Sequence, residues 1–108
     1  MRLMLEDIHG NSKPAKLGGW LWGKRITISP NSYDEGRKNF TELHDFFTQS
    51  FGPGIDIQTL ETLNPRPLCN WIYQIESKYG NHRFFVKERK DLDWFLLKYN
   101  DKLNNWSR

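Results

Sequence analysis

Hydrophobic and polar residues alternate along residues 20–29, WLWGKRITIS. Aromatic and β-branched residues at every second position favour a pleated strand with two different faces. One face would carry Trp20, Trp22, Ile26 and Ile28, interrupted by Lys24, and the other Leu21, Arg25 and Thr27. Pro30 has no amide to donate to a strand ladder, so the strand is expected to end before it.

The next segment changes to the period of a helix, and both of its ends are marked. Ser32 and Glu35 have capping-box spacing, in which each side chain bonds an amide left free at the helix start. Gly52 suits the left-handed conformation that ends a helix. Gly36 weakens the first turns, so the firm part of the helix is expected at about residues 39–51. The apolar stripe is formed by Phe40, Leu43, Phe47 and Phe51.

Residues 68–88, LCNWIYQIESKYGNHRFFVKE, have the alternation of a β-hairpin. Gly80–Asn81 is expected to be its two-residue turn, because glycine adopts the positive φ that such turns require. The segment after Glu88 returns to the helical period, and Asp91 and Asp93 lie in the first turn, where the helix dipole favours anions. The apolar stripe of this second helix is formed by Leu92, Phe95, Leu96 and Tyr99.

Two other segments leave alternatives open. Residues 1–19 are either an N-terminal extension or a short strand at residues 2–8 with an irregular lead-in after it. Within residues 54–67, alternating isoleucines favour a short strand or extended edge and then a loop, although the spacing of the leucines also suits a helical turn. Residues 102–108 are expected to be a tail, in which Trp106 either packs back onto the sheet or is an exposed anchor.

The order of these elements predicts one α+β domain at residues 20–101. Each long helix has a single apolar stripe, so both helices are expected to cover the same face of an antiparallel sheet. This arrangement is a ferredoxin-like sandwich that lacks its last strand, unless a strand at residues 2–8 supplies the missing pairing. The other face of the sheet would then be bare and would meet whatever the protein recognises.

Composition agrees with one small domain whose core is built from rings. The chain has 108 residues, of which 37% are hydrophobic and 15% aromatic. Large rings bury more area than aliphatic side chains, so a small core needs few of them. The net charge of +3 indicates an anionic partner only weakly, because acidic and basic residues are mixed along the chain.

Cys69 is the single cysteine, so an intrachain disulfide is excluded and a reducing compartment is expected. No apolar stretch is long enough for a membrane span, and the first ten residues lack the apolar region of a signal peptide. A cytoplasmic protein without a membrane partner is therefore expected.

Motifs for catalysis or cofactor binding are absent from the sequence. The three histidines, His9, His44 and His82, have no metal-ligand spacing with each other or with Cys69. The glycines of GGWLWG precede a strand instead of opening a helix, so they do not form a phosphate loop. We therefore expect no cofactor, no metal and no enzymatic activity. The alternative is a small enzyme with His44 or His82 beside a carboxylate.

Nucleic-acid binding is a second alternative. The segments TELHDFFTQSFG and RFFVKERKDLDWF resemble parts of RNA-recognition domains, which stack bases on rings of the sheet. Phe85 falls at one stacking position of that family, but Arg83 and Thr27 stand where the other two rings belong. A single-stranded nucleic acid would then be bound through its phosphates, by Arg25, Arg83, Lys87 and Arg89.

The candidate interaction surface lies on the face expected to be bare. Its apolar members are out of phase with the main core set, and exposed apolar patches on small domains often mark protein interfaces. A protein partner or a homodimer is therefore the favoured prediction. The surface consists of Leu21, Arg25, Ile72, Arg83, Phe85 and Lys87.

About twenty residues near the C-terminus resemble small uncharacterised accessory proteins of tailed phages, especially marine T4-like phages. In those proteins a strand with the pattern FxxK runs into a helix with the pattern D-x-x-x-F-x-L-K-Y/W. The matching residues here are Phe84, Phe85, Val86 and Lys87, then Asp91, Phe95, Leu97, Lys98 and Tyr99. The resemblance implies a ferredoxin-like protein of the host cytoplasm and no functional site.

Overall fold

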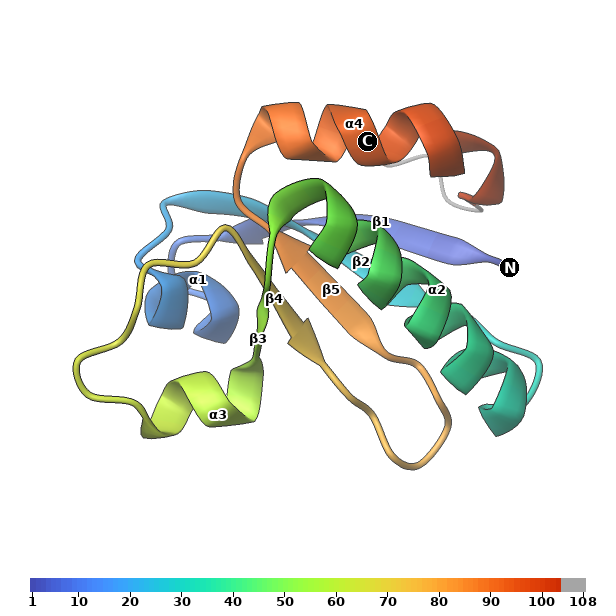
Figure 1. Cartoon of the computed structure of the whole chain (residues 1–108), viewed down its shortest axis with the longest axis horizontal. Helices are drawn as coiled ribbons and strands as arrows, with labels where there is room; N and C mark the ends of the chain where they lie inside the picture. The colour runs from blue at the N-terminus through green and yellow to red at the C-terminus, as the bar shows by residue number, and fades with distance from the viewer. Residues whose placement is uncertain (104–108) are drawn as a thin grey trace.

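The computed structural model describes residues 1–103, which form a five-stranded mixed sheet with helices on both faces (Figure 1). Neighbouring strands are antiparallel except β3 and β4, which are parallel. In spatial order the strands are β1 (Leu3–His9), β2 (Trp22–Ile28), β5 (Arg83–Val86), β4 (Trp71–Gln74) and β3 (Ile55–Asp56). The helices are α1 (Lys13–Gly18), α2 (Tyr33–Phe51), α3 (Ile57–Thr62) and α4 (Arg89–Tyr99), followed by the 3₁₀ turn η1 (Asn100–Lys102).

The predicted α+β class is confirmed, whereas the strand order differs from that of a simple sandwich. Strand β1 lies at one edge and pairs with β2 along its whole length, from Leu3 opposite Ile28 to His9 opposite Trp22. The two-residue strand β3 lies at the other edge, parallel to β4. The first nineteen residues therefore belong to the sheet and its covering helices. The prediction for Trp106 lies outside the described residues.

The main core lies between the sheet and the two long helices, α2 and α4. Phe47 of α2 is fully buried at the centre of a group of aromatic rings. Its ring stacks on Trp71, Phe84 and Phe95 with centroid distances of 5.2, 5.1 and 5.6 Å. The predicted stripes of both helices thus share one core, and we call this side of the sheet the α2/α4 face.

The opposite face, here called the α1/α3 face, is not bare as predicted. The short helices α1 and α3 cover part of it, and Ile72 and Phe85 beneath them are 0% and 2% exposed. The expected loop after β3 is instead helix α3, whose Leu60 is buried in this second cluster. Trp20 also packs here, and not beside Trp22 as the alternation predicted, because β2 begins only at Trp22.

The connection between β4 and β5 is longer than the predicted turn at Gly80–Asn81. The last pair of the ladder is Gln74 with Arg83, so residues 75–82 form the loop. The carboxylate of Glu76 accepts hydrogen bonds from the amides of Lys78, Tyr79 and Asn81. These bonds curl the chain before the expected strand is complete.

His82 closes the same loop, and we expect its titration to make stability depend on pH. The residue is 2% exposed, and its Nδ1 accepts a hydrogen bond from the amide of Glu76 at 2.9 Å. Burial lowers the pKa of His82 below its ordinary 6.5, the charge of Glu76 opposes this shift and that of Arg37 adds to it. Because the folded state resists protonation, its stability is present above pH 6.5 and is lost as the pH falls through the lower folded pKa.

Urea unfolding at a series of pH values would measure this loss. The variant His82→Asn keeps an acceptor oxygen near the position of Nδ1 and does not titrate, so its unfolding free energy should change less as the pH falls below 6.5. His9 is exposed, and the control His9→Asn should retain the wild-type dependence. Equal pH dependence in the wild type and in His82→Asn would contradict the assignment.

Candidate functional site

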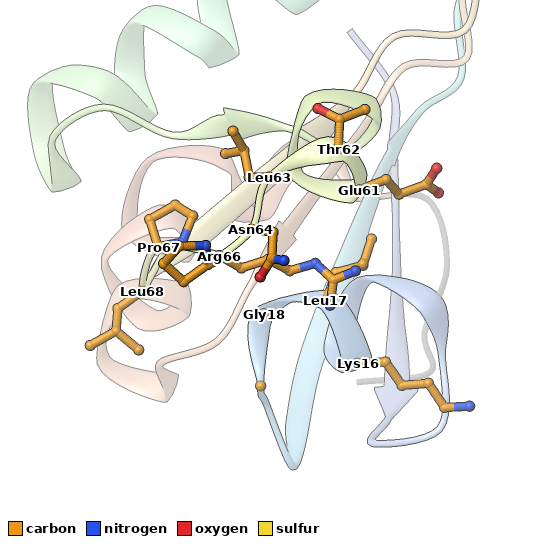
Figure 2. A pocket seen from close by; sticks show the side chains of 12 residues that line it. Lys16, Leu17, Gly18, Glu61, Thr62, Leu63, Asn64, Arg66, Pro67 and Leu68 are labelled. Carbon is orange, nitrogen blue, oxygen red and sulfur yellow. The ribbon is translucent and has the colours of Figure 1, made fainter.

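A groove of about 630 Å³ opens between α1, α3 and the segment of residues 63–68 (Figure 2). We call it the α1–α3 groove. Its lining residues come from two stretches far apart in the chain, residues 16–19 and residues 61–68. The volume lies within the range of about 300–1,000 Å³ that is usual for ligand sites.

Local sequence explains why the groove exists. Helix α1 ends at Gly18, and the residue after it, Gly19, has a φ of 72° and turns the chain toward β2. An ion pair between Lys13 and Glu61 joins the starting turn of α1 to α3. The segment after α3 contains two prolines and is almost entirely exposed, so it extends around the groove as an irregular wall. The groove is therefore bounded by two short helices and one extended segment.

Two hydrogen bonds hold this wall in place. Nε of Arg66 donates to the carbonyl oxygen of Leu60 at 3.3 Å, which ties the segment to α3. Nε1 of Trp20 donates to the carbonyl oxygen of Cys69 at 3.1 Å, which ties its far end to the start of β2. Figure 2 shows Arg66 reaching from the segment toward Leu17 of α1.

Two large apolar side chains next in sequence to the residues of the second bond are exposed to solvent. Leu21 follows Trp20 in the chain and is 94% exposed, and Leu68 precedes Cys69 and is 98% exposed. Figure 2 shows Leu68 extending away from α1. Leu17 and Leu63, which line the groove, are half-buried. Leu21 is not among the lining residues, whereas Leu17, Leu63 and Leu68 give the groove an apolar part, as is typical of a recognition site.

The charge around the groove is mostly positive. Lys16 and Arg66 line both the groove and a smaller hollow beside it, which Lys13 also lines. Glu61 is the one carboxylate among the residues that line the two, and it is paired with Lys13. The remaining positive charge would attract an acidic partner.

The groove offers little for covalent chemistry. Neither His44 nor His82 lines it. Burial raises the pKa of the Cys69 thiol above 9.0, and the charge of Lys87 offsets this only in part. A thiol in that state is a poor nucleophile at neutral pH. Within residues 1–103, no three histidine, cysteine or acidic side chains are grouped so as to hold a metal ion.

The six residues predicted as an interaction surface are not brought together. Leu21 is exposed and is not one of the residues that line the groove, whereas Ile72 and Phe85 are buried beneath α1 and α3. Arg25 forms a two-bond pair with Glu6, at 2.9 and 3.3 Å. Lys87 is exposed and Arg83 half-buried, both at positions outside the groove lining.

The sequence does not predict most of the residues that line the groove, because they follow neither the period of a helix nor that of a strand. The sequence LNPRPL reads as a loop between elements, and the position of a loop depends on contacts with distant residues such as Trp20. The pair of leucines that flank two prolines was the available indication that this loop carries apolar side chains.

None of the helices in the described part of the chain combines the length and the apolarity needed to cross a membrane. Comparison of the chain with protein-family models, with curated proteins and with solved structures finds no match.

Proposed function

We propose that the protein is a non-enzymatic interaction module that binds an extended segment of a partner protein in the α1–α3 groove. The observation that carries the proposal is the 98% exposure of Leu68 in the lining of the groove, together with that of Leu21, 94% exposed and two residues beyond the lining residue Gly19. Burying a leucine side chain contributes about 1.5–3 kcal/mol, so a partner that covers both would gain substantially.

The chemistry of the groove indicates the kind of segment that fits. The apolar rim would receive one or two aliphatic side chains, and the cations Lys16 and Arg66 would pair with acidic residues beside them. Charge pairs at the rim of an interface mainly increase the association rate and the specificity. The predicted partner is thus an extended peptide in which leucines lie between aspartates or glutamates.

A labelled peptide with leucines between aspartates tests this proposal. We expect it to shift amide resonances of residues 16–19 and 61–68 in a ¹⁵N spectrum, and the same peptide with lysines in place of aspartates to leave them unchanged. The variants Leu68→Asp and Leu21→Asp should each weaken binding at least about tenfold, because each places a carboxylate where the peptide's leucine would be buried.

Leu97→Asp is the matched control, since Leu97 is 79% exposed but lies on α4, at the opposite face of the sheet. It should bind the peptide as the wild type does. An equal loss of peptide affinity in Leu97→Asp would contradict the proposal, and so would resonance shifts confined to residues outside 16–19 and 61–68. A labelled single-stranded oligonucleotide at low salt belongs in the same series, and binding through Arg25 and Arg83 instead would favour the nucleic-acid alternative.

We further propose that β2, α2, β4, β5 and α4 form a ferredoxin-like unit. The antiparallel neighbours β2–β5–β4 and the placement of α2 and α4 over one face support this assignment. Strand β1 then lies beside β2, at the edge that the missing last strand would leave open. A tailed-phage origin and a cytoplasmic location stay predictions.

A further inference from the structure

Lys24 is a buried cation in the middle of strand β2, on the α2/α4 face. Its side chain is 6% exposed, and its Nζ lies 2.5 Å from Oδ1 of Asp7, the residue opposite it on β1. The side chain of Asp7 is 59% exposed, so the pair runs from the interior to the surface. A buried ammonium is costly unless its hydrogen-bond donors find acceptors.

Lys24 lies at a cleft of about 330 Å³ between the sheet and α4, which we call the Lys24 cleft. One wall is the ring of Trp22, with the guanidinium carbon of Arg89 over it at 5.0 Å from the ring centroid. The lining combines two cations, two carboxylates and an apolar surface. Besides Trp22, Lys24 and Arg89, its members are Leu5, Asp7, Leu92, Asp93 and Leu96.

The two cations retain donors for a ligand. An ammonium has three N–H donors and a guanidinium has five. Among residues 1–103, the structure pairs Lys24 with Asp7 and gives Arg89 its contact with the Trp22 ring. A carboxylate that enters the cleft between Lys24 and Arg89 would accept charge-assisted hydrogen bonds, which are about twice as strong as neutral ones.

The carboxylates of Asp7 and Asp93 favour a ligand that also has a positively charged group. A simple carboxylate would meet these two negative charges, whereas a zwitterion offers them an ammonium group. Lys24 and Arg89 balance the two carboxylates, so a neutral ligand with separated charges matches the cleft better than an anion. The leucines of the lining provide an apolar surface for its side chain.

We propose that the Lys24 cleft binds a free α-amino acid with an apolar side chain. The carboxylate lies against Lys24 and Arg89, the ammonium against Asp7 and Asp93, and the side chain packs toward Leu92 and Leu96 of α4. The cleft is on the opposite face of the sheet from the α1–α3 groove, so this inference goes beyond the proposed function.

Three small molecules of the same shape test the charge pattern. Leucine carries both charges, 4-methylpentanoate lacks the ammonium, and 3-methylbutylamine lacks the carboxylate. In titrations followed by ¹⁵N spectra and calorimetry, we expect leucine to shift the amides of Trp22, Lys24 and Arg89. Each analogue should bind at least about tenfold more weakly, because it leaves one pair of charges without a partner.

Variants of the protein test separately the contacts of the ligand's carboxylate and those of its ammonium group. Lys24→Met should lose leucine binding, and a thermal melt shows whether it is folded. Asp93→Asn changes an exposed side chain, so the variant is expected to fold. It should weaken leucine binding, whereas 4-methylpentanoate, which the charge of Asp93 repels, should bind at least as well as it does to the wild type. Lys16→Met removes a lysine from the other face and should bind leucine as the wild type does.

The absence of leucine-induced shifts at Trp22, Lys24 and Arg89 at millimolar concentrations would overturn the proposal. Equal binding of leucine and both analogues would overturn it as well, because the charges would then play no part. Unchanged leucine affinity in Asp93→Asn would contradict the placement of the ammonium.

Discussion

Replacing Phe47 by alanine should lower the free energy of unfolding by about 3–5 kcal/mol. Phe47 is fully buried, and its ring stacks on rings from β4, β5 and α4. Removing it leaves a cavity where three other elements meet helix α2. Because small domains are stable by about 5–15 kcal/mol, the loss would be a large part of the total. Urea unfolding followed by tryptophan fluorescence and by circular dichroism measures it.

Leu97→Ala provides the comparison for this variant. Leu97 is 79% exposed on α4, and its truncation should change the unfolding free energy by no more than about 0.5 kcal/mol. If Phe47→Ala cost under about 1 kcal/mol, the ring stack would not be the centre of the core.

Gly36→Ala should also destabilise the protein, against the usual helix preference. Alanine in a helix is favoured over glycine by about 1 kcal/mol. Here a Cβ at position 36 would lie 2.5 Å from the carbonyl oxygen of Gly80, in the loop between β4 and β5. Both atoms belong to the backbone or are fixed to it, so α2 or the loop must move. Overpacking of this kind costs about 1–3 kcal/mol, and the net effect is expected to be a loss.

A second variant in the same helix distinguishes helix propensity from the steric contact with Gly80. Lys38 is exposed in the same helix, so Lys38→Gly should cost about 1 kcal/mol from propensity alone. Losses in both variants would mean that Gly36 is required by its contact with Gly80. A gain in stability in Gly36→Ala would show instead that the two segments separate easily.

The two long helices were predictable because each repeats its pattern over several turns. The stripe of Phe40, Leu43, Phe47 and Phe51 predicted α2, and the structure buries Leu43 and Phe47 most deeply. The predicted cap is confirmed, since α2 begins at Tyr33 and the amide of Glu35 donates to Oγ of Ser32. The expected weakness of the first turns stays a prediction. The packing of Gly36 against Gly80 joins residues that are distant in sequence, and no local pattern reports it.

The second face of the sheet could not be predicted in the same way. Helices α1 and α3 have six residues each, too few for a periodic pattern to stand out. Without them the alternation of Ile72 and Phe85 suggested exposure, although both are buried. The turn after β4 was misplaced for a related reason: the acceptor oxygens of Glu76 outweigh the preference of Gly80 for a tight turn.

The two candidate binding regions were visible only in part. Lys24 interrupts the apolar alternation of β2, which marks it as unusual, but its partner Asp7 belongs to a segment whose structure the sequence left open. Leu21 was included in the predicted surface, and Leu68 was not. Each follows or precedes a residue of the bond between Trp20 and Cys69, which joins residues 49 positions apart and which no local pattern reports.

The central pairing of β2 with β5 also constrains how the chain folds during synthesis. Arg25 lies opposite Phe85, so β2 has a partner at only one edge, β1, until the ribosome has released the residues of β5. An open strand edge is a template for association with other chains. Helix α2 is complete much earlier, and its apolar stripe can shelter one face of the β1–β2 hairpin during this interval.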